Sequence, residues 1–198
     1  MKLSEQKQLD ILNAAEQLFY VHGAEHTSMD NIAKAANVSK RTVYNHFETK
    51  EVLFYAIIER MKCSLEGTEA VAYNPSQSIK LQLMRIAEKE VQLLTSDKFL
   101  IGAKIAFVQM LQQPDLAKQL SGSKVGCHVY LEDFLSAACQ DKQLVIDDFT
   151  LAVQQFVYQL KSHIFYPKLY GFDIPSAQQE RYLIEQTVDL FLARYQAR

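Results

Sequence analysis

Apolar and polar positions along the chain repeat with the period of an α-helix, and no convincing stretch alternates with the period of two that marks a β-strand. The first pattern, over residues 4–21, places five apolar residues on one helical face: Ile11, Ala14, Ala15, Leu18 and Phe19. Further helices are expected over residues 28–36, 40–47, 50–70, 76–95, 97–112, 115–140, 148–165 and 177–195. The expected fold class is therefore all-α.

The breaks between these patterns carry turn-forming residues. Gly23 ends the first helix, and residues 73–76 form the clearest linker, with Pro75 at the first position of the next helix. Gly126 lies inside the 115–140 pattern and is expected to bend or split it, together with residues 121–123. Residues 167–175 begin and end with proline and are expected to be a loop.

Residues 28–47 predict two short helices joined by a tight turn. Thr27, followed by Asp30 three residues later, has the pattern of a capping box at the start of the first helix. Asn37 lies at the turn, because asparagine tolerates the left-handed conformation that ends a helix. Ser39 is a good N-cap for the second helix, whose Val43 and Phe47 face inward at i and i+4. This order of residues predicts a helix-turn-helix.

The side chains left facing outward suit DNA. The N-terminal residues of the second helix reach base edges in a helix-turn-helix, so base contacts are expected from Lys40, Arg41 and Thr42. Phosphate contacts are expected from Ser28, Tyr44, His46 and Lys50, and Asn45 could make either kind of contact. Residues 34–50 carry four basic side chains and one acidic side chain, which is a local basic patch.

The same stretch resembles a known signature. The run Ile32-Ala33-x-x-Ala36-x-Val38-Ser39-x-x-Thr42-Val43-Tyr44-x-His46-Phe47-x-x-Lys50-x-x-Leu53 is similar to the DNA-binding signature of the TetR family of bacterial transcription regulators. The flanks are similar too: Leu18-Phe19 before Gly23, and a helix that opens at Lys50-Glu51. Asn37 stands where family members usually carry glycine. The resemblance is specific over about residues 8–65 and extends more weakly to residues 114–117 and 188–195.

The resemblance implies a domain organisation and partners. Residues 1–53 would be the DNA-binding domain, with the helix-turn-helix at about 28–47, and residues 54–198 would bind an effector and dimerise. A homodimer would form through the last two helices, about 148–165 and 177–195, which also look apolar over more than one face. A small effector would bind among the middle helices and shift the helix that starts at residue 50.

Candidates for the effector pocket are aromatic, sulfur-containing and imidazole side chains on the later helices: Phe107, Met110, Cys127, His128, Phe134 and Tyr158. Cys127 and His128 are expected to share a helix face with Leu131 and Phe134. Such side chains at helical spacing are also typical of a packed core, so both interpretations stay open here.

Composition narrows the function. The net charge is −2, and residues 1–53 carry six basic and seven acidic side chains, so only the local patch indicates DNA binding. No apolar run approaches the roughly 18 residues that span a bilayer, and the N-terminus lacks the apolar core of a signal peptide, so a cytoplasmic protein is expected. The three widely spaced cysteines fit neither a disulfide scaffold nor a CxxC metal site and are expected to be buried.

No catalytic constellation, metal-ligand set or cofactor motif is recognisable, so neither an enzyme nor a cofactor is expected. The sequence predicts a homodimeric DNA-binding transcription regulator, a repressor that leaves its operator when a small molecule binds. The alternative keeps the fold but lacks an effector: a DNA-bound architectural or division-control factor whose C-terminal domain binds another protein. A helical enzyme that uses the hairpin only as scaffold is the third hypothesis.

Overall fold

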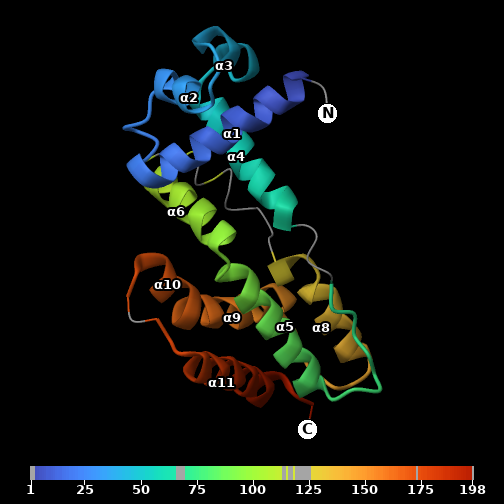
Figure 1. The fold of residues 1–198 in the computed structure, drawn as a ribbon. Coiled ribbons are helices and arrows are strands. Elements are labelled where there is room, and N and C mark those ends of the chain that lie inside the picture. The colour runs from blue at the N-terminus through green and yellow to red at the C-terminus, as the bar shows by residue number, and fades with distance from the viewer. Residues whose placement is uncertain are drawn as a thin grey trace. The chain divides into compact units, whose positions relative to one another are not determined.

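The computed structural model describes residues 3–65, 70–112, 115, 118, 126–172 and 174–197, and its regular structure over these residues is helical (Figure 1). The helices are α1 (Leu3–His22), α2 (Met29–Ala35), α3 (Lys40–His46), α4 (Lys50–Leu65), α5 (Ile79–Leu94), α6 (Asp97–Gln112), the 3-10 helix η1 (Gly126–Val129), α8 (Leu131–Gln140), α9 (Phe149–Leu160), the π-helix η2 (Lys161–Phe165), α10 (Tyr166–Tyr170) and α11 (Ala177–Tyr195). The expected all-α fold class is confirmed.

The chain forms two compact units, each made of two segments. Unit 1 comprises Met1–Ser64 and Asp97–Ser123, and unit 2 comprises Leu65–Ser96 and Lys124–Arg198. Packing therefore places α6 with the N-terminal helices, although it follows them only after α5. The division into functional parts at residue 53 stays a prediction, because compactness alone does not say which residues serve which function.

Unit 1 is built around α1, which packs against α2, α3 and α6. In Figure 1, α2 and α3 lie together at one end of this unit. Its core contains Ile11, Phe19, Ile32, Val43, Leu53, Ile57 and Ile105. On α6, a Cβ at Gly102 would collide with the Met61 side chain of α4, so glycine allows these helices to approach closely. The Lys104 ammonium lies 5.5 Å from the centre of the Tyr20 ring, which adds a contact between α6 and α1.

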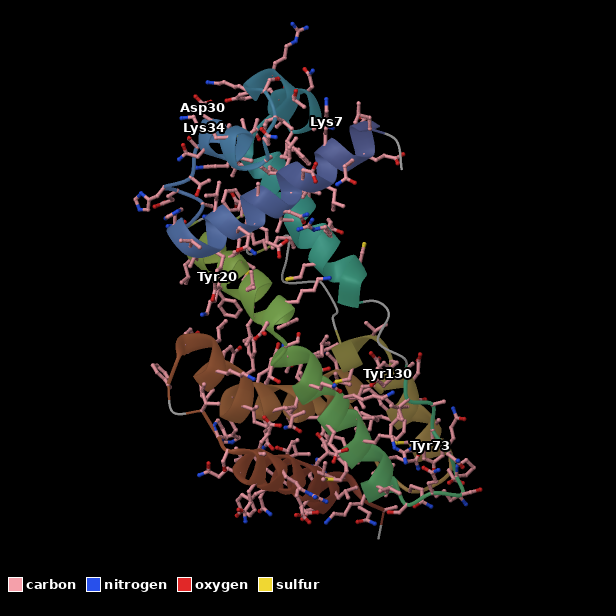
Figure 2. All side chains as sticks on the ribbon, viewed as in Figure 1. Lys7, Tyr20, Asp30, Lys34, Tyr73 and Tyr130 are labelled. Atoms are coloured by element: carbon pink, nitrogen blue, oxygen red, sulfur yellow. The ribbon has the colours of Figure 1, made fainter. Side chains whose placement is uncertain are left out.

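Unit 2 is a helical assembly in which α5 packs against α11 and α9, and α8 packs against α9. Its core includes Leu83, Ile86, Leu131, Leu135, Phe156, Leu160, Val188 and Phe191. The Phe156 and Phe191 rings meet edge to face at 5.3 Å, and the Tyr73 and Phe134 rings do so at 5.6 Å. Tyr73, in the segment before α5, also donates a hydrogen bond to Asp141 at 2.5 Å, so this segment is held to the end of α8 (Figure 2).

Several helix boundaries differ from expectation. The helix predicted over residues 50–70 does not reach residue 70, which is not helical, and α4 is described over Lys50–Leu65. Pro75 does not start α5, which begins at Ile79 after Ser78. The Ser76 N–H instead donates to Asn74 Oδ1 at 2.9 Å, so residues 74–77 form an Asx-type turn before the helix.

The pattern over 115–140 is split, as Gly126 suggested, although residues 121–123 lie outside the described part. Gly126 has φ +67° and is the first residue of η1, and α8 follows as a separate helix. Cys127 and His128 therefore lie in η1 and not on a face of α8, so that expectation was wrong. The pattern over 148–165 contains the π turn η2 after Leu160, and Pro167 lies in the first turn of α10 instead of a loop.

Candidate nucleic-acid interface

The start of α2 is set by Ser28. Its side chain accepts a hydrogen bond from the Asn31 N–H at 3.1 Å, as an N-cap should. The capping box predicted at Thr27 is wrong: Thr27 is 2% exposed, and its hydroxyl donates to the Gly23 carbonyl at 2.8 Å. Thr27 therefore donates a hydrogen bond to a carbonyl at the end of α1, and Ser28 caps the start of α2.

The turn between α2 and α3 has the expected geometry. Asn37 adopts φ +52°, which confirms the left-handed residue. The Val38 N–H then donates back to the Ala33 carbonyl at 3.0 Å, so the end of α2 is closed by the turn itself. The Ser39 side chain accepts from the Thr42 N–H at 3.0 Å, which confirms it as the N-cap of α3.

The two faces of α3 are separated as the sequence predicts. Val43 is fully buried and Phe47 is 2% exposed, so these side chains fix the helix onto unit 1. Arg41, Tyr44 and Asn45 are exposed, while Thr42 and His46 are half-buried. The Thr42 hydroxyl lies 2.7 Å from the Ser39 hydroxyl.

Lys40 forms an ion pair with an acidic residue that the sequence did not predict as its partner. Its ammonium lies 2.7 Å from the Asp30 carboxylate, and this hydrogen bond and charge raise the pKa of Lys40. Asp30 belongs to α2 and lies close to Lys34 in Figure 2. The pair is exposed, so solvent weakens it and DNA could compete for the ammonium. In the described part of the chain, the neighbouring Arg41 guanidinium makes no ion pair and is available to a ligand.

Lys50, the first residue of α4, lies differently from the other predicted contacts. Its ammonium donates to the Ala24 carbonyl at 2.6 Å and to the Thr27 carbonyl at 3.4 Å. The side chain is thus turned back onto the loop between α1 and α2. The partners in this contact and in the Asp30–Lys40 pair are ten or more residues apart, so no local sequence pattern predicts either contact. For the Asp30–Lys40 pair, the opposite charges were the only indication in the sequence.

The six predicted effector residues are divided between the two units. Phe107 and Met110 lie on α6 in unit 1, and the other four lie in unit 2. Among these four, Cys127 and Phe134 are buried in the core, whereas Tyr158 is 52% exposed on α9. The His128 and Tyr158 rings lie 6.3 Å apart. Their role in binding an effector stays a prediction.

Unit 2 also contains a buried carboxylate that the sequence did not predict. Glu90 of α5 is 3% exposed, and it accepts a hydrogen bond from the Cys127 N–H at 2.7 Å. Burial raises the pKa of Glu90 and lowers the pKa of nearby Lys161, the first residue of η2. Burial also raises the pKa of the Cys127 thiol, so this cysteine is held neutral and unreactive.

A surface groove of about 590 Å³ runs along α9 and α11. Its apolar lining includes Leu151, Tyr158 and Leu190, which are 46%, 52% and 55% exposed. Polar residues complete it, among them Gln155, which accepts a hydrogen bond from the Tyr195 hydroxyl at 2.6 Å. This groove lies on the two segments that were predicted to dimerise.

Three further observations concern the other sequence expectations. Cys63 is exposed, so the expectation of three buried cysteines was wrong. Over the described residues, no group of three or more His, Cys, Asp or Glu side chains is arranged to hold a metal ion. Within the same residues, no helix combines the length and the apolar character needed to cross a bilayer.

An α3 with an exposed outer face, held by a left-handed turn against the core of unit 1, in a chain with a second helical unit, is the arrangement of a helix-turn-helix transcription regulator. Two family descriptions match the chain: "Bacterial regulatory proteins, tetR family" over residues 11–57, and "AefR-like transcriptional repressor, C-terminal domain" over residues 81–197. The chain belongs to the TetR family, as the sequence signature indicated.

Individual relatives agree with this assignment. A TetR family transcriptional regulator from Pseudomonas syringae pv. tomato has 33% identity and a TM-score of 0.81 over 98% of this chain and 99% of its own. The flavonoid-responsive regulator FrrA has 29% identity and a TM-score of 0.80 over 98% and 99%. The HTH-type transcriptional regulator UidR of Escherichia coli is 26% identical over 141 residues, which are 67% of this chain but 64% of UidR.

Proposed function

We propose that this regulator is a homodimeric repressor that binds an operator through α3 and leaves it when a small molecule binds. The observation that carries the proposal is the exposed outer face of α3, held in place by buried Val43 and Phe47. The match of residues 81–197 to a family described as transcriptional repressors supports the direction of control. A regulator that acts on DNA also belongs in the cytoplasm, where we place it.

We assign base contacts to Lys40, Arg41 and Thr42, and phosphate contacts to Ser28, Tyr44, His46 and Lys50, with Asn45 able to make either. Arg41 is the strongest candidate, because its guanidinium is exposed and can grip guanine by two hydrogen bonds. Lys40 must exchange Asp30 for a base or phosphate. Ser28 still has a hydroxyl proton to donate to a phosphate while it caps α2.

The test begins with selection of bound duplexes from a random pool, because the sequence of the operator is not known. Fluorescence anisotropy on the selected and a scrambled duplex then compares wild type with Arg41→Ala. A loss of about 1–3 kcal/mol on the selected duplex and little on the scrambled one supports the base contact. Equal losses on both duplexes would contradict it, and no salt-sensitive binding of wild type to any duplex would contradict the proposed function.

We propose that the effector is a small, mainly aromatic molecule bound in unit 2, through some of Cys127, His128, Phe134 and Tyr158. Support comes from the similarity to FrrA, which is described as flavonoid-responsive. A release screen should therefore include flavonoids and simpler phenols beside aliphatic metabolites. If none dissociates the selected duplex, the alternative of a regulator without a small-molecule effector is favoured.

We propose that two copies associate through α9 and α11, along the groove described above. The exposed apolar side chains of that groove are the support, since pairing would bury them. Leu190→Arg should shift the protein from dimer to monomer in sedimentation velocity experiments. Leu81→Arg is a matched control, because Leu81 is a 53% exposed leucine on α5 of the same unit and outside the groove. Equal dissociation of both variants would place the interface elsewhere.

A further inference from the structure

Lys161, the first residue of η2, carries a half-buried ammonium. Over the described residues, no carboxylate forms an ion pair with it, whereas the exposed Lys40 pairs with Asp30 at 2.7 Å. The Lys161 ammonium lies instead 5.6 Å from the centre of the Tyr158 ring. Burying a cation is costly unless a partner compensates it, and burial lowers the pKa of Lys161 accordingly.

Glu90 offsets only part of this cost. Its charge raises the pKa of Lys161, but burial has the larger effect, so this pKa stays below its ordinary value. The Glu90 carboxylate accepts a hydrogen bond from the Cys127 N–H at 2.7 Å, and a Cβ at Gly126 would lie 2.9 Å from its Oε1. Because these contacts hold the carboxylate against η1, it cannot approach Lys161 without giving up a buried hydrogen bond. The remaining positive charge favours an anion that a ligand supplies.

An irregular turn of the backbone presents Lys161. The Tyr166 N–H donates to the Lys161 carbonyl, five residues earlier, which is the hydrogen bond of a π-helix. Ile164 and Phe165 are both buried, so the turn keeps its apolar side chains in the core while Lys161 remains beside Tyr158. Single π turns inside helices are frequent at functional sites.

Two rings from different elements extend this site. Tyr158 of α9 is 52% exposed, and the ring of the half-buried His128 of η1 lies 6.3 Å from the Tyr158 ring. Aromatic rings pack favourably in offset or edge-to-face pairs with centres about 4.5–7 Å apart. A ligand ring packed against the exposed part of Tyr158 would therefore bring an acidic substituent within reach of Lys161.

We infer that Tyr158, His128 and Lys161 bind an aromatic anion, whose ring packs against Tyr158 and whose ionised oxygen pairs with the Lys161 ammonium. The inference rests on the proposed effector and narrows its chemical class, because it requires an acidic group such as a carboxyl or an acidic phenol. The bound anion would raise the pKa of Lys161 and compensate its burial. A neutral aromatic molecule would leave that cost in place and should bind more weakly.

The site adjoins the groove proposed for the second copy. Tyr158 and Ser162, which lie on either side of Lys161 in sequence, both line that groove along α9 and α11. A ligand that pairs with Lys161 and displaces the Tyr158 ring would change the surface on which the two copies pack. Binding at Lys161 is thus linked to the proposed dimer contact through Tyr158.

Isothermal titration calorimetry on the full chain without DNA tests the site with two matched pairs of probes. Cinnamate is compared with methyl cinnamate, and para-nitrophenolate with para-nitroanisole, so the members of each pair differ in the ionised oxygen. We expect wild type to bind at least one anion about tenfold or more tightly than its neutral partner, because a charge-assisted hydrogen bond forms. The pair that shows the preference tells whether the acidic group is a carboxyl or a phenol. Lys161→Met, which keeps the length of the side chain, should remove the preference and leave the affinity for the neutral probe unchanged.

Lys168→Met is the matched control, because Lys168 is a half-buried lysine on α10 of the same unit. It should keep the preference, and so should Lys161→Arg, which keeps a charged donor. The inference is overturned if wild type binds no probe, if it binds both members of each pair equally, or if Lys161→Met keeps the preference. Release of the selected duplex is measured separately. Binding of an anion at Lys161 without release would contradict the effector role but not the site, whereas release by a neutral compound alone would contradict the site but not the proposed function.

Discussion

The contact between Gly126 and Glu90 allows a quantitative prediction for unit 2. Gly126 has φ +67°, a conformation that disfavours any other residue by about 1–2 kcal/mol. A Cβ at this position would also lie 2.9 Å from Glu90 Oε1 and closer still to Oε2. Gly126→Ala should therefore strain the backbone and push the carboxylate away from the Cys127 N–H, to which it is bound at 2.7 Å.

The two contributions can be added. Above the folded-state pKa of Glu90, where the group is ionised, a hydrogen bond to it contributes about 1.5–3 kcal/mol, and Glu90 is too deeply buried for water to replace the lost donor easily. With the backbone cost of about 1–2 kcal/mol, Gly126→Ala should lower the free energy of unfolding by about 2.5–5 kcal/mol. Urea titration followed by far-UV circular dichroism measures this quantity.

Gly171 supplies the matched control. It has φ +74° in the same unit, but a Cβ there would meet nothing within 4 Å. Gly171→Ala should therefore lower the free energy of unfolding by only the backbone cost, about 1–2 kcal/mol. In a Glu90→Ala background, the added cost of Gly126→Ala should fall to the same value. Equal losses for the two glycine variants in the wild-type background would refute the argument, because they would mean that Glu90 leaves room beside Gly126.

Two further predictions concern single side chains. Burial raises the pKa of Glu90 above 4.5, so the folded state binds this proton more tightly than the unfolded state, and the stability present below pH 4.5 is lost as pH rises through the folded pKa. Glu90→Gln should remove that fall from the urea midpoints measured between about pH 4 and pH 8, and an unchanged profile would contradict the assignment. Asp30→Asn should free Lys40 and remove a negative charge beside it, so scrambled duplexes should bind more tightly at low salt; anisotropy titrations at several salt concentrations check this, with unchanged affinity as the contrary result.

The features that the sequence predicted correctly are those decided by neighbours along the chain. Ser39 caps α3 by accepting from the N–H of Thr42, three residues later. Asn37 ends α2 through its own left-handed backbone conformation. The bounds of α6 were predicted correctly as residues 97–112, and those of α1 within one residue. Such local preferences act within one or two turns, so they can be recognised without knowledge of the fold.

The features that were mispredicted depend on contacts between distant residues. Thr27 and Ser28 are adjacent hydroxyl residues, and either could cap α2; burial of Thr27 against the end of α1 decides between them. The two carbonyls that Lys50 meets are also distant in sequence, so its position did not reveal them, and its phosphate contact stays a prediction. The π turn after Leu160 could not be predicted either. The apolar period continues through it, and only the backbone hydrogen bonds differ from those of an α-helix.

The attachment of α4 limits how a signal could reach the recognition helix. Beyond the Lys50 contact at its first residue, α4 is also joined to α1 through Arg60, which donates to Asn13 Oδ1 at 2.7 Å and pairs with Glu16. Sliding α4 past α1 would break these hydrogen bonds together, and side chains in a packed core favour discrete arrangements over gradual deformation. An effector that acts through α4 would therefore move α1, α2 and α3 with it. On the proposed mechanism, release from DNA is then a change in the separation of two intact recognition helices, and α3 should keep its hydrogen-exchange protection in the effector-bound state.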